Sequence, residues 1–205
     1  MRPAAVALAA VAWLLGPGST APLRAQEERG TPLGLYVMPT LELNFRGERG
    51  TFAGDPFEFG NGPAFGLRAH AWLTDVFGVA AHGSRARAAH CQPRLATCTP
   101  NEVTLWHGLG ELAVRVKPGV PGYFVVGGGV TVVAPDADAS DAFQGPSHAE
   151  PTLTAGAAAD LRAGPRAIFR FDLRFYFVIP KDQEGLQMNS TQTDFAIGLG
   201  LGYRL

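Results

Sequence analysis

The chain has 205 residues, of which 46% are hydrophobic and 17% charged, and its formal net charge is −1. This composition excludes a disordered chain, and without an excess of positive charge we expect no nucleic-acid binding. The length suits one domain, and two cysteines are too few for a disulfide scaffold or a zinc site of the four-ligand kind.

The first residues have the features of a secretory signal. An arginine precedes a twelve-residue apolar run, Ala4 to Leu15, which small and polar residues follow. The run is too short to span a bilayer as a helix, which needs about 20 apolar residues. We expect cleavage after Ala25, with cleavage after Ala21 or an uncleaved anchor as the alternatives. The predicted organisation is a signal at 1–25 and one domain at 26–205.

Eight later segments alternate apolar and polar side chains with a period of two, which is typical of strands with one apolar face. The clearest is the last, where Phe195, Ile197 and Leu199 alternate with alanine and glycine. The orientation of one segment, 123–133, is undecided because both of its faces are apolar. In chain order the predicted strands are 33–46, 63–73, 76–85, 103–116, 123–133, 153–163, 167–179 and 195–205.

The connections between these strands alternate in length. Two residues, Thr74 and Asp75, join the second strand to the third, whereas sixteen, 86–101, join the third to the fourth. Transmembrane barrels alternate in this way because their periplasmic turns are short and their extracellular loops long. The long connections are 47–62, 86–101, 134–151 and 180–192.

The polar face favours a membrane barrel over a water-soluble one. A surface exposed to water would carry many lysines, yet the only two, Lys117 and Lys181, lie at predicted strand ends. The polar face instead mixes glycine and alanine with arginine and aspartate, which suits a narrow interior. The prediction is an all-β fold, an eight-stranded antiparallel up-and-down transmembrane β-barrel. Aromatic residues that could form interfacial girdles are Tyr36, Trp72, Trp106, Tyr123 and Tyr203, with Tyr36 and Trp72 placed inward by the alternation.

With its secretory signal, eight amphipathic strands and a last strand ending Gly202-Tyr203-Arg204-Leu205, the chain resembles the small outer-membrane β-barrel family of the OmpA and OmpX kind. The resemblance implies a monomer in the bacterial outer membrane that contacts its lipid and folds with the barrel-assembly machinery. It implies no enzymatic activity and no cofactor.

The predicted inner face carries five charges of each sign. Unpaired charges in so narrow an interior would be costly to desolvate, so we expect arginines and carboxylates to pair across strands and plug the lumen. We expect Asp172 to lie between Arg170 and Arg174. The full set is Glu42, Arg68, Glu111, Arg115, Asp160, Arg162, Arg170, Asp172, Arg174 and Asp194.

Three further groups of residues have side chains that could carry out chemistry or bind a metal. Cys91 and Cys98 are predicted to form a local disulfide in the second long loop, with free thiols or metal ligation as alternatives. His82 and Ser84, with Glu111 on the next strand, look similar to the residues of outer-membrane lipid A deacylases. The alternation places the first two inside the lumen, so we expect polar filling there.

A metal site in the third long loop is the weaker hypothesis, because the spacing of its acids lacks the glycine and terminal glutamate of an EF-hand. Its residues are Asp136, Asp138, Asp141 and His148. The run Gly127 to Gly129 is expected to allow close packing within a strand. The sequence thus predicts a non-enzymatic barrel with a structural or recognition role. A lipid-modifying enzyme using His82 and Ser84, or a narrow solute pore, is the alternative.

Overall fold

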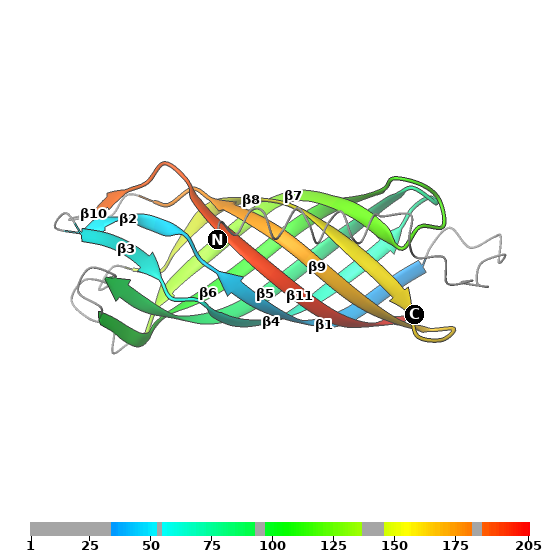
Figure 1. The fold of residues 1–205 in the computed structure, drawn as a ribbon, viewed down its shortest axis with the longest axis horizontal. Coiled ribbons are helices and arrows are strands. Elements are labelled where there is room, and N and C mark those ends of the chain that lie inside the picture. Colours follow the sequence, from blue (N-terminus) through cyan, green and yellow to red (C-terminus); the bar gives the residue numbers. More distant parts are fainter. Residues whose placement is uncertain (1–33, 53–54, 93–96, 137–145, 182–185) are drawn as a thin grey trace, which may run out of the picture.

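The computed structural model describes residues 34–205 except 53–54, 93–96, 137–145 and 182–185, and it describes no side chains at 52, 55–57, 90–92, 97–102 and 186–188. The predicted signal therefore lies outside the described residues. Within them, eight long antiparallel strands close into an elongated barrel (Figure 1). The described part contains no helix that is long and apolar enough to cross a membrane.

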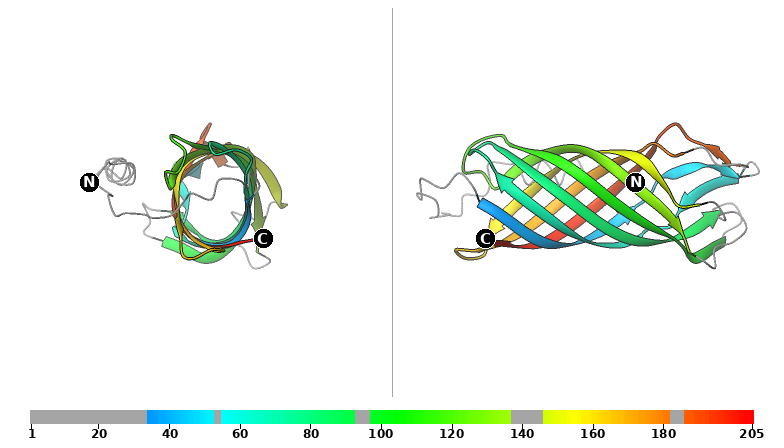
Figure 2. Two further views of the ribbon diagram at one scale, coloured as in Figure 1. Left: turned by 90° about the vertical axis from the view of Figure 1, so that its right-hand side faces the viewer. Right: turned by 180° about the vertical axis from the view of Figure 1, so that it is seen from behind.

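Each long strand pairs with its two neighbours in the chain, and the first pairs with the last. β1 pairs with both β4 and β11, and the β5–β6 pairing completes the ring that is seen end-on in Figure 2. The predicted eight-stranded up-and-down antiparallel barrel is therefore confirmed. Its strands are β1 (Gly34–Phe45), β4 (Gly62–Trp72), β5 (Phe77–Gln92), β6 (Thr97–Arg115), β7 (Gly122–Pro135), β8 (His148–Arg162), β9 (Ala167–Val178) and β11 (Gln192–Arg204).

One end of the barrel has tight turns, and we call it the turn end; the other is the loop end. At the β4–β5 turn the Thr74 hydroxyl accepts a hydrogen bond from the backbone N–H of Phe77 (2.8 Å). Gly119 and Gly164, in the other two turns, have φ angles of 80° and 125°, which only glycine adopts without strain. The chain ends at the turn end, as Figure 1 shows.

The loop end is more ordered than the sequence predicted. Three short strands, β2 (Glu48–Phe52), β3 (Asp55–Phe59) and β10 (Leu186–Met188), form within segments expected to be loops. β2 pairs with β3 and β10, and β3 also pairs with β5. The three short strands therefore extend the barrel wall at the loop end (Figure 1). β5 and β6 also run beyond their predicted ends, to Gln92 and from Thr97.

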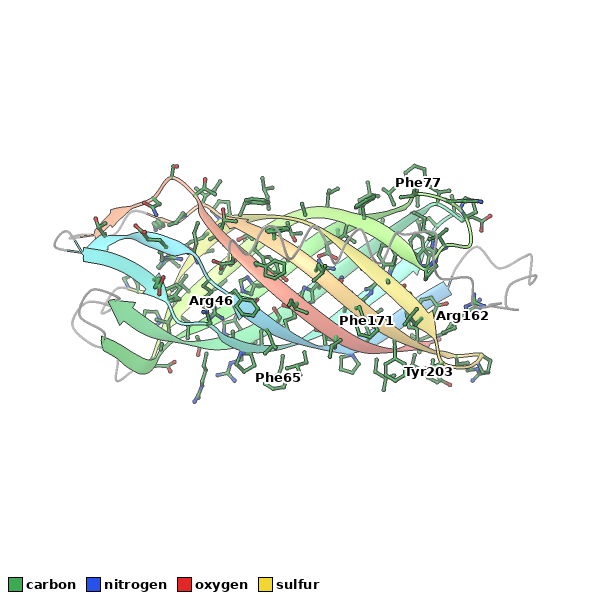
Figure 3. All side chains as sticks on the ribbon, viewed as in Figure 1. Arg46, Phe65, Phe77, Arg162, Phe171 and Tyr203 are labelled. Carbon is green, nitrogen blue, oxygen red and sulfur yellow. The ribbon has the colours of Figure 1, made fainter. Side chains whose placement is uncertain are left out.

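Side chains alternate between an exposed, apolar outer face and a buried inner face. Outward Leu43, Phe65 and Leu153 are 51%, 67% and 59% exposed, whereas inward Glu42 and Arg68 are 1% and 0% exposed. Figure 3 shows Phe65, Phe77 and Tyr203 on the outside of the wall. The undecided strand, β7, faces inward with the odd-numbered residues Tyr123, Val125, Thr131 and Val133.

Not every aromatic residue near a strand end joins the outer surface. Trp106 and Tyr203 are about half exposed on the outside, at 48% and 51%. Trp72 and Tyr123 are buried in the lumen, where their rings meet edge to face at 5.1 Å between centroids. The inward placement of Trp72 is therefore confirmed, and an interfacial role is wrong for Trp72 and Tyr123.

Candidate functional site

The centre of the lumen is filled by a cluster of two arginines and two carboxylates from three strands, β4, β6 and β9. Glu111 on β6 contacts Arg68 on β4 at 3.1 Å between Nη1 and Oε2, and Arg174 on β9 donates to its other oxygen. Arg174 also donates to Asp172 at 3.0 Å, while Arg68 lies 3.7 Å from the same carboxylate. All four side chains are at most 3% exposed. We call these residues the central cluster.

Glycines on the neighbouring strands leave room for this cluster. Gly127 on β7 is the cross-strand partner of Glu111, and a Cβ added there would lie 2.9 Å from Cγ of Glu111. Gly156 on β8 is the partner of Arg174, and a Cβ added there would collide with the backbone of Leu173. Each of these long side chains therefore has a residue without a side chain beside it on the next strand. The close packing predicted for the run from Gly127 to Gly129 is present, since a Cβ at Gly129 would collide with the backbone of β6.

Toward the loop end the cluster continues through hydrogen-bonded polar groups. His82 Nε2 lies 3.1 Å from Oε1 of Glu42, and the Tyr176 hydroxyl donates to the other oxygen of Glu42 (3.2 Å). The ring of Tyr176 stacks on His107 with centroids 5.3 Å apart, and His107 Nδ1 is 2.8 Å from the Thr131 hydroxyl. Five strands, β1, β5, β6, β7 and β9, are thus connected across the interior.

Toward the turn end a second ion pair is capped by aromatic rings. Arg170 donates to Asp160 at 2.9 Å and lies 2.6 Å from Nδ1 of His70. The Tyr123 hydroxyl also donates to Asp160 (3.0 Å). The guanidinium of Arg115 lies 3.5 Å from the centroid of the Trp72 ring, at the favourable distance for a cation–π contact.

A third ion pair closes the loop end and joins three segments. Arg49 on β2 pairs with Glu150 on β8 and donates to Gln192 on β11 (3.0 Å), and both ionic side chains are at most 2% exposed. Glu150 also accepts from the backbone N–H of Lys181 (3.0 Å) and lies 3.1 Å from Nε2 of His148. We call Arg49, Glu150 and Gln192 the loop-end clasp.

The structure places most of the ten predicted lumen charges inside, with three departures. Arg162 is exposed at the end of β8 rather than buried. Asp172 lies between Arg170 and Arg174 on the inner face of β9, as expected, but it contacts Arg174 and Arg68, whereas Arg170 pairs with Asp160.

The third departure is Asp194. It accepts hydrogen bonds from Gly47 N–H and the Gln192 amide, and no described arginine donates to it. Its carboxylate therefore belongs to the loop end and lies apart from the central cluster.

Several buried polar groups lie outside the set of ten predicted lumen charges. The alternation places His70 and His107 on the same inward faces as predicted charges, and both are buried there. Arg49 and Glu150 lie beyond the predicted strand ends, where no periodic signal exists.

His82 and Ser84 both point into the lumen and are 3% and 4% exposed. His82 contacts Glu42, and the hydroxyl of Ser84 has no described hydrogen-bond partner, so the two do not form a base–nucleophile pair. Glu111, the third residue of that hypothesis, is engaged by two arginines. The arrangement is that of polar filling.

Cys91 and Cys98 lie on β5 and β6, where their backbones are direct cross-strand partners, rather than in a loop. Their side chains lie outside the described ones, and the disulfide stays a prediction. Of the third-loop residues, Asp138 and Asp141 lie outside the described residues. Asp136 accepts from Thr104 (3.2 Å) and His148 faces Glu150, and the described side chains include no cluster that could hold a metal.

Neither a protein-family model nor a curated protein sequence matches the chain. Solved structures do. The outer-membrane protein AlkL in lipid bilayers aligns with a TM-score of 0.53 and 16% identity over 88% of this chain and 94% of that one. The chain has the fold of the small outer-membrane β-barrels. Neisserial surface protein A (TM-score 0.49, 10% identity, 83% and 97% coverage) and OprG from Pseudomonas aeruginosa (0.49, 12%, 86% and 98%) also align.

This fold and the apolar outer face together place the barrel in the bacterial outer membrane. Large apolar side chains such as Leu67, Leu199 and Phe171 are 57%, 49% and 43% exposed, which water would penalise and lipid does not. By the usual orientation of such barrels, the turn end is periplasmic and the loop end extracellular.

Proposed function

We propose that the protein is a non-enzymatic outer-membrane barrel whose lumen is closed and whose role is recognition through its extracellular end. The observation that carries this proposal is the central cluster, in which Arg68 and Glu111 are fully buried and paired across the lumen. An open aqueous pore would leave such charges hydrated and exposed. Ion pairs and rings at both ends add two further layers of filling.

The loop-end clasp supports the recognition role. The ion pair of Arg49 with Glu150 holds the β2–β3 hairpin against the barrel. Glu150 also accepts a hydrogen bond from the backbone of Lys181, in the segment that follows β9. Two extracellular segments are therefore held in defined positions at their bases. Surfaces held in this way bind partners at a lower entropic cost than mobile loops.

Planar bilayer recording tests the closed lumen. We expect the refolded mature protein to give no steady conductance. A double variant, Arg68→Ala with Glu111→Ala, removes two large side chains from the centre and should conduct measurably, which shows that inserted protein is being observed. Steady conductance by the unmodified protein would contradict the proposal and favour the narrow-pore alternative.

A further inference from the structure

Two arginines interrupt the apolar outer wall near the loop end. Arg85 and Arg87 lie on the outward face of β5 and are exposed. The cross-strand partners of Arg85 are Phe65 and Trp106, which are 67% and 48% exposed on the same face. The guanidinium of Arg85 lies 5.1 Å from the centroid of the Trp106 ring. Both cations are thus on the lipid side of the wall, and Arg85 lies beside two aromatic residues.

Their height in the membrane follows from the strand geometry. Phe77, the first residue of β5, is 50% exposed at the turn end. From there to Arg85 the strand climbs about 20 Å, given ~3.3 Å per residue and a tilt of about 40°. Since the apolar band of such barrels is about 25 Å tall, the two arginines lie at its extracellular border, where lipid phosphates begin.

Neither arginine has a described carboxylate partner. Arg85 contacts the Trp106 ring, and Arg87 is paired across the sheet with Thr104. Asp136, which follows β7, accepts a hydrogen bond from Thr104. In the lumen, by contrast, Arg49, Arg170 and Arg174 are bonded to acids. A guanidinium at a lipid border is stabilised by an anion, and phosphate matches its fork of donors.

The wall directly beneath is bare. Gly83 and Gly108 are cross-strand partners on the outward face, and a Cβ added at Gly108 would meet nothing within 4 Å. An acyl chain can therefore lie against the backbone below the two cations, between outward Leu67 and Val130, which are the next partners along this row.

We propose that Arg85 and Arg87, with Trp106 and Phe65, form a binding site for the phosphate headgroup of an anionic lipid in the extracellular leaflet. The arginines hold the phosphate, and the rings and bare wall contact the glycerol or sugar region and the upper acyl chain. This site is independent of the closed lumen.

Trp106 provides a local reporter. A chain produced without the predicted signal, residues 1–25, has one other tryptophan, Trp72, which is buried in the lumen. A Trp72→Phe background therefore leaves Trp106 as the single tryptophan. The protein is refolded into phosphatidylcholine vesicles that contain a minor fraction of phosphatidylglycerol. Either lipid is brominated near its headgroup, and quenching of Trp106 gives the relative affinity of the two lipids at that position.

We expect phosphatidylglycerol to be preferred about fivefold or more, since each arginine near an anionic surface contributes appreciably to lipid attraction. The double variant Arg85→Gln/Arg87→Gln should bring the ratio close to one. The matched control is Arg166→Gln, which removes an exposed arginine from the turn end, where it donates to the Tyr203 hydroxyl, and should leave the ratio unchanged.

Resistance of each variant to unfolding in sodium dodecyl sulfate without boiling verifies that the barrel has formed. Inorganic phosphate added to the vesicles should not displace the lipid, and displacement would mean that the arginines bind the free ion. A ratio near one for the unmodified arginines, or an unchanged ratio in the double variant, would also overturn the proposal.

Discussion

Glu111 is shared by two arginines, and this makes it the most sensitive residue of the lumen. Arg68 has no other carboxylate closer than 3.7 Å, and Arg174 retains only Asp172 if Glu111 is removed. Removing one partner of a buried ion pair is costly because the other charge stays buried without compensation. The two carboxylates of the central cluster therefore differ in importance.

We predict that Glu111→Ala lowers the free energy of unfolding by roughly 3 to 5 kcal/mol. Asp172→Ala should cost less, about 1 to 3 kcal/mol, since Arg174 keeps its bond to Glu111. Urea unfolding of the barrel in lipid vesicles measures both. The exposed Asp75 is the matched control, with an expected loss under about 1 kcal/mol for Asp75→Ala. Equal losses for Glu111 and Asp75 would mean that the cluster is hydrated.

The ion-pair partners of the lumen residues are harder to predict from sequence than the face of the strand on which each residue lies. Alternation placed Asp160, Arg170 and Asp172 on the inner face, and all three are there. It could not select partners, because these depend on the stagger of the strands around the barrel. Asp172 and Arg170 share one face of β9 but do not pair with each other. Asp172 contacts Arg68 on β4, and Arg170 pairs with Asp160 on β8.

At the scale of elements, the sequence predicts strands best where a polar and an apolar face alternate. β9 and β11 were found nearly to their ends for this reason. The loop-end part of β5 was missed because alanines occupy positions on both faces from Ala86 to Ala89. They remove the difference in polarity between the two faces. β2 and β3 were missed because their pairing depends on contacts with distant segments, such as that of Arg49 with Glu150.

The lipid-facing side of β9 gives a prediction at this scale. Leu173 lies on the outer face between Phe171 and Phe175 near the middle of the strand. Leu173→Arg should cost roughly 2 to 4 kcal/mol of folding free energy in vesicles, the penalty for a cation at the bilayer midplane. Leu161→Arg, near the turn end of β8, is the control, and its expected cost is about 0 to 1 kcal/mol. A Leu173→Arg barrel as stable as the control would show that this face is not in lipid.

The loop-end clasp predicts a local effect. Arg49→Ala removes the ion pair with Glu150 and the cation–π contact with Phe59, whose ring centroid is 4.8 Å from the guanidinium. We expect amide hydrogen exchange in the β2–β3 hairpin to accelerate by about a hundredfold or more, as the loss of a buried pair allows. Exchange in β9 and β11 should be unchanged, and acceleration throughout the barrel would instead indicate global destabilisation.

At the scale of the whole molecule, the fold could be predicted because its two constraints are visible in the sequence. Backbone groups in lipid must be bonded within a closed sheet, and alternation with unequal connections signals such a sheet. The closure itself, between β1 and β11, brings together residues from both ends of the described chain. The layers of side chains in the lumen depend on this closure. The sequence therefore predicts which residues fill the lumen but not which of them are in contact.

The most direct test of the central claim, a closed barrel integrated in the outer membrane, is electrophoresis of the membrane fraction with and without boiling. A closed sheet resists unfolding by detergent, so the unboiled mature protein should migrate faster than the boiled protein. Recovery of the protein in the soluble periplasmic fraction, with the same mobility before and after boiling, would contradict the account.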